Sequence, residues 1–163
     1  DRRAADVLLV RDAVRFLADI ASICGPGGGV LIGVDLKKDP RVLHEAYNDC
    51  EGVTAAFNLN LIERIRRELG WDIWAEDFEH YSFYNPRHSR MEMHLVSLKE
   101  QEIDTGNGAI RFYEGESVWT ESSYKYGSDE FEKLAAAAGF HTVQAWSDER
   151  HWFSVQYLLN DGV

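Results

Sequence analysis

The sequence predicts an α/β fold with a small, β-rich lobe that is inserted into it or packed on it. Three observations predict it. A helix, a glycine turn and an apolar strand follow one another near the start, helical periodicity fades over residues 71–126, and a helix with two strands returns over 128–159. The 163 residues are 45% apolar, which suits one domain or two small, closely joined lobes.

The first α/β segment begins with a helix expected over residues 12–24, where apolar side chains recur at helical spacing. The glycine stretch 25–29 follows this helix and opens a strand. A phosphate-binding loop has the reverse order, so we interpret the stretch as a plain turn. The apolar run 30–34 is typical of a parallel strand buried on both faces. Asp35 follows at its carboxyl end, where open α/β sheets bind ligands.

Two helices are expected next. Asp39-Pro40 reads as an N-cap and a first helical residue, and the helix runs to about residue 47. The second helix covers about 52–69. Its apolar residues recur every four positions, at Val53, Phe57, Leu61, Ile65 and Leu69. Asn58 and Asn60 lower the helix propensity, so they either face water or point into a polar cleft.

Residues 71–126 predict the β-rich lobe. Met91, Met93 and Leu95 alternate with polar or smaller residues, as on a two-faced strand. Gly106–Gly108 is a tight-turn signal, and 110–113 is the expected returning strand.

The α/β pattern then returns. Ser128 is the expected cap of a helix that Gly139 ends, and strands over about 140–146 and 152–159 form a closing hairpin at a sheet edge. The chain is thus expected to divide into 1–47, 48–126 and 127–163.

Composition excludes several function classes. A net charge of −11 disfavours nucleic-acid and membrane-surface partners. No apolar run is long enough for a bilayer. Cys24 and Cys50 have no CxxC spacing, which favours a reduced, cytoplasmic setting. The six histidines show no metal-ligand spacing, so no metal site is expected, and no cysteine–histidine pair or serine elbow indicates a nucleophile.

Three segments carry the candidate chemistry. They are residues 46–60, the strand 91–95, and residues 116–126 with their carboxylates, hydroxyls and aromatic rings. Taken alone, the methionine face of the strand is better explained as ordinary core. In the third segment a carboxylate and a hydroxyl stand two residues apart, which suits an imidazole with its two ring nitrogens.

These segments resemble the histidine Nα-methyltransferases of ergothioneine biosynthesis, which depend on S-adenosylmethionine. The resemblance covers about residues 12–159 and is specific in the combination of the stretches GVDLKKDP, AYND, GVTAAFNLN, FYNP, SRMEMHLVS and ESSYKY. It implies the C-terminal part of a Rossmann-like class I methyltransferase sheet with a small α+β substrate-binding lobe. Residues 1–47 would be partial core, 48–126 the lobe, and 127–163 the helix and hairpin that complete the sheet.

The resemblance also implies site residues. Glu121 and Ser123 match the residues that hold the substrate imidazole, and Tyr47 matches a tyrosine near the amino and carboxylate end of the substrate. Phe57 and Met93 match apolar pocket residues. No catalytic residue is implied beyond substrate positioning. Three methyl transfers to the α-amine of histidine would give hercynine.

The family binds S-adenosylmethionine on a strand and glycine loop expected upstream of residue 1, so the missing N-terminal half is expected in the same or another chain. Residues 1–11 do not show the family's GSTIGN-like segment. The small-molecule partner would be histidine or a related amine. The alternatives are a methyltransferase for another amino acid or an indole amine, and a non-catalytic remnant that binds a small molecule.

Overall fold

A computed structural model of the chain describes residues 2–162, and the side chains from residue 11 onward. Asp1 and Val163, the outer ends of the first and third expected parts, lie outside the described residues. The chain forms two compact units. The sheet unit comprises Asp1–Lys38 and Tyr124–Val163, and the lobe comprises Asp39–Ser123. The lobe is therefore one continuous insertion into the sheet unit, and it starts earlier in the chain than residue 48.

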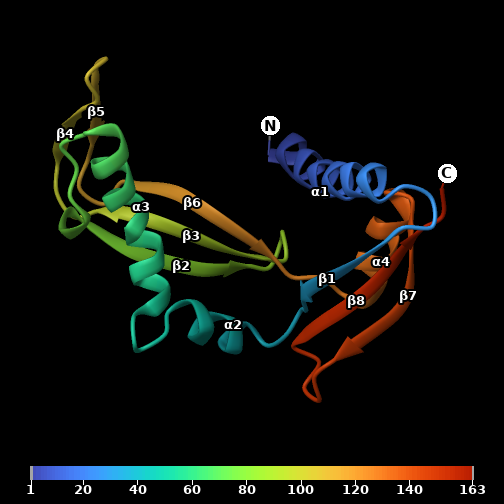
Figure 1. Ribbon diagram of the computed structural model, residues 1–163. Helices are drawn as coiled ribbons and strands as arrows, with labels where there is room; N and C mark the ends of the chain where they lie inside the picture. Colours follow the sequence, from blue (N-terminus) through green and yellow to red (C-terminus); the bar gives the residue numbers. More distant parts are fainter. Residues whose placement is uncertain (1, 163) are drawn as a thin grey trace. The chain divides into compact units, whose positions relative to one another are not determined.

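The sheet unit contains the helices α1 (Arg2–Cys24) and α4 (Ser128–Ala137) and the strands β1 (Gly29–Asp35), β7 (Phe140–Ser147) and β8 (Phe153–Asn160). Its sheet has the order β1-β8-β7, with both pairs antiparallel (Figure 1). The α/β class and the closing hairpin of β7 and β8 are confirmed. The N-cap of α4 is Gly127 rather than Ser128, because the Glu130 carboxylate accepts the Gly127 N–H at 2.8 Å.

Strand β1 differs from the expected parallel strand with two buried faces. It pairs antiparallel with β8, and one parallel bridge follows it, between Leu36 and Tyr126. Val34 is buried, whereas Leu31 on the opposite face is 65% exposed. Within the described unit α1 and α4 pack against one face only, through a core of Leu17, Ala21, Val34, Leu36, Phe131, Leu134, Ala135, Ala138, Phe140 and Leu158.

The lobe contains two helices, α2 (Pro40–Tyr47) and α3 (Val53–Leu69), a short 3-10 turn η1 (Ala75–Asp77), and five strands. The strands are β2 (Phe78–Asn85), β3 (Arg90–Ser97), β4 (Gln101–Asp104), β5 (Ala109–Phe112) and β6 (Ser117–Tyr124). They form the sheet β2-β3-β6 and the hairpin β4-β5, and α3 lies across the sheet (Figure 1). No described helix is both long and apolar enough to cross a membrane.

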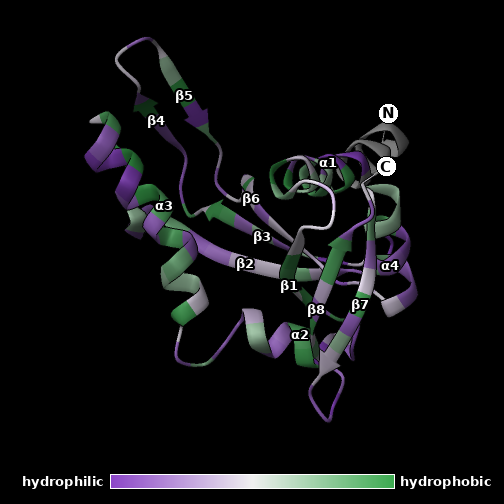
Figure 2. Ribbon diagram, turned by 45° about the vertical axis from the view of Figure 1, so that its right-hand side comes forward, coloured by the Kyte–Doolittle hydropathy of each residue, from purple (hydrophilic) through white to green (hydrophobic). Residues whose placement is uncertain are grey.

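Helix α3 does not bury the apolar stripe that its sequence suggests. Four of the five stripe residues are exposed: Val53, Phe57, Leu61 and Leu69. The face toward the sheet instead carries Asn58 and Ile62, and Ile62 joins a core of Ile73, Phe78, Leu95 and Ile103. Figure 2 shows the mixed hydropathy along α3. Asn58 therefore points inward, while Asn60 is exposed.

Candidate functional site

A pocket of about 170 Å³ lies within the lobe, between α3 and β6. Its walls are aromatic, aliphatic, amide and charged, from Phe57, Asn58, Asn60, Leu61, Arg64, Thr120 and Glu121. Among the described residues, none donates a hydrogen bond to the Glu121 carboxylate from its side chain or main chain. The pocket thus offers an available carboxylate beside an exposed aromatic ring, which is a suitable wall for a small cationic or hydrogen-bond-donating ligand.

Asn58 fixes the base of this pocket. Its side chain is 3% exposed. The Thr120 hydroxyl lies 2.7 Å from Asn58 Oδ1 and 3.0 Å from the Met93 carbonyl oxygen. A hydroxyl has one hydrogen, so the two acceptors compete for it, and the shorter contact favours Asn58. The residue before Glu121 on β6 is in this way tied to α3.

The structure brings together two of the five residues that the sequence implicates, Phe57 and Glu121. Met93 is 2% exposed and does not line the pocket; its main chain is joined to the pocket through Thr120. Ser123 lies two residues beyond Glu121 on β6 and is half-buried. Because side chains alternate along a strand, Ser123 and Glu121 project from the same side of β6 as Trp119, whereas Thr120 projects toward α3. Strand β6 is an edge strand of its sheet, and Glu121 lines the pocket from this edge.

Tyr47 is the last residue of α2 and is half-buried. Its carbonyl oxygen lies 2.9 Å from His80 Nε2 and 3.3 Å from the Ser82 hydroxyl. Asn48 continues this attachment, because its side-chain amide donates to the Ser82 carbonyl at 3.3 Å. The end of α2 is therefore attached to β2, and the attachment continues to the pocket, since His80 Nδ1 lies 3.0 Å from Asn58 Nδ2.

The opposite face of the lobe sheet carries a buried ion pair. Arg90 Nε lies 2.8 Å from Glu92 Oε1, and the Asn85 amide donates to the same oxygen at 2.9 Å. The Arg90 guanidinium also stacks on the Trp119 ring at 4.3 Å. Burial by itself raises the pKa of Glu92, but the hydrogen bonds from Arg90 and Asn85 and the charge of Arg90 together hold it below its ordinary value.

This face also supports Glu121. Trp119 stacks on His94, which stacks on Phe83, and the Trp119 indole N–H donates to the Glu121 carbonyl at 2.9 Å. The two residues that precede Glu121 on β6, Trp119 and Thr120, are therefore held from opposite faces of the sheet.

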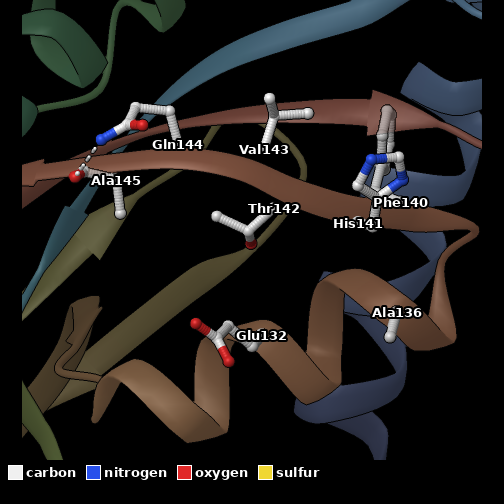
Figure 3. Close-up of a pocket in the computed structure, with 8 residues that line it drawn as sticks. All are labelled: Glu132, Ala136, Phe140, His141, Thr142, Val143, Gln144 and Ala145. Carbon is white, nitrogen blue, oxygen red and sulfur yellow. Dashed lines mark hydrogen bonds between the residues drawn. The ribbon is translucent and has the colours of Figure 1, made fainter.

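A second pocket, of about 500 Å³, lies in the sheet unit (Figure 3). Glu132 and Ala136 of α4 contribute to it, and the other six lining residues come from positions 140–145 of β7. None of the five implicated residues lies there. Its histidine, His141, is paired with Asp161 at 2.6 Å. Among the residues that the structure describes, no group of three or more His, Cys, Asp or Glu side chains is placed to hold a metal ion.

The residues that organise the lobe pocket are only partly visible in the sequence. Asn58 carries a signal, because an asparagine inside a helix lowers helix propensity and then requires a reason. His80 and Thr120 carry none: their importance depends on the antiparallel register of β2 and β3 and on the position of β6, which join residues far apart in the chain.

Residues 8–160 match the profile of a protein family described as histidine-specific methyltransferase, SAM-dependent. A histidine N-alpha-methyltransferase of Mycobacterium tuberculosis is 37% identical over 137 residues, which are 83% of this chain and 43% of that protein. The ergothioneine biosynthesis protein 1 of Neurospora crassa is 31% identical over 150 residues, 83% of this chain and 15% of that protein.

Among solved structures, a crystal structure of an S-adenosylmethionine-dependent methyltransferase from Clostridium acetobutylicum aligns with 94% of this chain and 52% of its own chain. The identity is 9% and the TM-score 0.45. By comparison, the chain spans 43% of the length of the mycobacterial relative, which is less than half of that protein.

Proposed function

Because this chain belongs to the family of S-adenosylmethionine-dependent, histidine-specific methyltransferases, we propose that it is the substrate-binding part of an enzyme that methylates the α-amine of histidine. The product of complete methylation would be hercynine, in ergothioneine biosynthesis. The remainder of the enzyme, which binds the cofactor, would come from the same or another chain. We propose a cytoplasmic setting, in keeping with the free thiols of Cys24 and Cys50.

The observation that carries the proposal is the pocket that joins Phe57 and Glu121. In the proposed complex the Glu121 carboxylate accepts a hydrogen bond from one imidazole N–H, and the Ser123 hydroxyl satisfies the other ring nitrogen. Phe57 supplies an aromatic face, which attracts a cation. Tyr47 completes the substrate-binding set, toward the amino and carboxylate end of histidine. Met93, which the resemblance also implicates, would contribute through its main-chain contact with Thr120, because its side chain is buried outside the pocket.

Methyl transfer requires orientation more than a strong acid or base, because the sulfonium of S-adenosylmethionine supplies an activated methyl group. The role of this chain is then to hold the imidazole firmly, so that the neutral α-amine points at the methyl carbon. Trp119 and Thr120 support that role, because they fix the strand on either side just before Glu121.

The described residues do not fit S-adenosylmethionine itself. Their glycine cluster, 25–29, follows α1 and opens β1, so it does not stand between a strand and a helix as a nucleotide-binding loop does. Asp35, at the end of β1, is already bound by Lys38 and Lys125. The cofactor site is therefore proposed to lie outside this chain.

The test is a methylation assay of the complete protein with labelled S-adenosylmethionine and histidine, beside calorimetric titration of the 163-residue chain with each ligand. We expect labelled hercynine from the complete protein. Histidine binding by the chain without S-adenosylmethionine binding would identify it as the substrate half. If an indole amine or another amino acid is methylated in preference to histidine, the enzyme has a different substrate. If histidine binds and no methyl transfer occurs, the protein is a binding remnant.

A further inference from the structure

A buried amide determines the protonation of a histidine in the lobe. Asn58 Nδ2 lies 3.0 Å from the main-chain carbonyl oxygen of His94 and 3.0 Å from His80 Nδ1. The carbonyl can only accept, so an NH₂ group and not the amide oxygen must face it. The Thr120 hydroxyl next to Asn58 Oδ1 fixes the same orientation.

The orientation of Asn58 leaves one arrangement for His80. The second hydrogen of the Asn58 amide points at His80 Nδ1, so Nδ1 must be the unprotonated acceptor of a neutral imidazole. The proton then sits on Nε2, and Nε2–H donates to the Tyr47 carbonyl at 2.9 Å. Both ring nitrogens are occupied by the protein.

We propose that Asn58 and His80 are positioning residues that hold Tyr47 for the amino-acid substrate, an inference that rests on the proposed function. The contact holds the last residue of α2, where no following turn of helix stabilises the backbone. Because Asn58 also lines the pocket of Phe57 and Glu121, one buried amide fixes both ends of the substrate site. Neither residue is assigned a part in the chemical step.

The first test compares two substitutions of His80 in the complete enzyme. His80→Leu fills a similar volume without a donor, and we expect the KM for histidine to rise about tenfold while the KM for S-adenosylmethionine stays within about twofold. His80→Gln presents an amide N–H near the position of Nε2 and should recover most of this loss. His44→Leu, at an exposed histidine of α2, the helix that ends at Tyr47, is the matched control and should leave both constants unchanged.

A second measurement does not depend on a variant that folds. Nitrogen-15 spectra of the histidine-labelled enzyme at neutral pH should show His80 with an unprotonated Nδ1 and a protonated Nε2. A proton on Nδ1 overturns this inference alone, and so does equal behaviour of the leucine and glutamine variants. Failure of the wild-type enzyme to bind histidine overturns the proposed function together with it.

Discussion

Lys125 Nζ lies 2.6 Å from Asp35 Oδ2, and the Lys125 side chain is completely buried. Lys38 Nζ lies 2.6 Å from the other carboxylate oxygen. The sequence places Asp35 at the end of an apolar strand, where α/β sheets often bind ligands. In the structure its two oxygens are paired with two lysines, Lys38 and Lys125. Of these, Lys125 lies in the segment after β6. Asp35 is therefore a structural residue of the sheet unit.

Removal of this carboxylate should destabilise the chain strongly. Asp35→Ala takes a charged partner from a buried ammonium group, and loss of one member of a buried ion pair costs about 3 kcal/mol. Lys38→Met is the control, because it removes the more accessible lysine, leaves the buried pair intact and should cost about 1 kcal/mol or less. Urea unfolding of both variants measures the difference. Equal free energies of unfolding would contradict the structural role of Asp35.

Stability should also depend on pH through Glu92. Its pKa lies below the ordinary value in the folded state, because Arg90 and Asn85 outweigh the effect of burial. A group with a lowered folded pKa stabilises the fold fully above its unfolded pKa of about 4.3 and loses this contribution as the pH falls through the folded value. Urea midpoints should therefore drop on acidification in that range.

The control for this pH dependence is Glu92→Gln, which cannot ionise. It leaves Arg90 without a carboxylate and should be less stable at neutral pH, but its unfolding midpoint should change less between about pH 6 and about pH 3. Parallel pH curves for the wild type and this variant would show that other carboxyl groups cause the acid sensitivity.

The sequence predicts the elements well wherever local chemistry decides them. Asp39 caps α2 by accepting the Arg41 N–H at 2.9 Å, and Gly70 ends α3 in a left-handed conformation. Both outcomes depend on a few neighbouring residues. Strand β3 buries Met91 and Leu95 as expected, but Arg90 and Glu92 on its other face are buried as well.

What the sequence cannot predict is which face of an element finds a partner. The i+4 apolar stripe of α3 suggests a buried face, but the lobe sheet packs on the neighbouring face that carries Asn58 and Ile62. Likewise β1 has the composition of a doubly buried strand, yet its described partners cover one face. Contacts over long sequence distances decide both cases, as they decide that His80 meets Tyr47.

Thr120→Val should destabilise the lobe, because it removes the hydrogen bond to Asn58. The substitution keeps the shape of the side chain but removes the hydroxyl, so the buried Asn58 amide oxygen loses its donor at 2.7 Å. An unsatisfied buried acceptor costs about 1–3 kcal/mol. Thr120→Ser retains the hydroxyl and should lose much less. Chemical denaturation compares the two; if valine is as stable as serine, the hydrogen bond contributes nothing measurable.

Glu121→Gln should weaken histidine binding in the complete enzyme without destabilising the lobe. Glu121 is exposed in the pocket, so its carboxylate is free to accept an imidazole N–H, and a hydrogen bond to a charged group contributes about 1.5–3 kcal/mol. The dissociation constant for histidine should therefore rise about tenfold or more.

Ser123→Ala should weaken binding by a smaller factor, because a neutral hydrogen bond contributes about 1 kcal/mol. Glu114→Gln, at an exposed carboxylate of the lobe that does not line the pocket, is the matched control and should leave histidine binding unchanged. Calorimetric titration measures all three, and thermal unfolding checks the fold. If both Glu121→Gln and Ser123→Ala bind histidine as the wild type does, the imidazole is held elsewhere and the proposed substrate geometry is wrong.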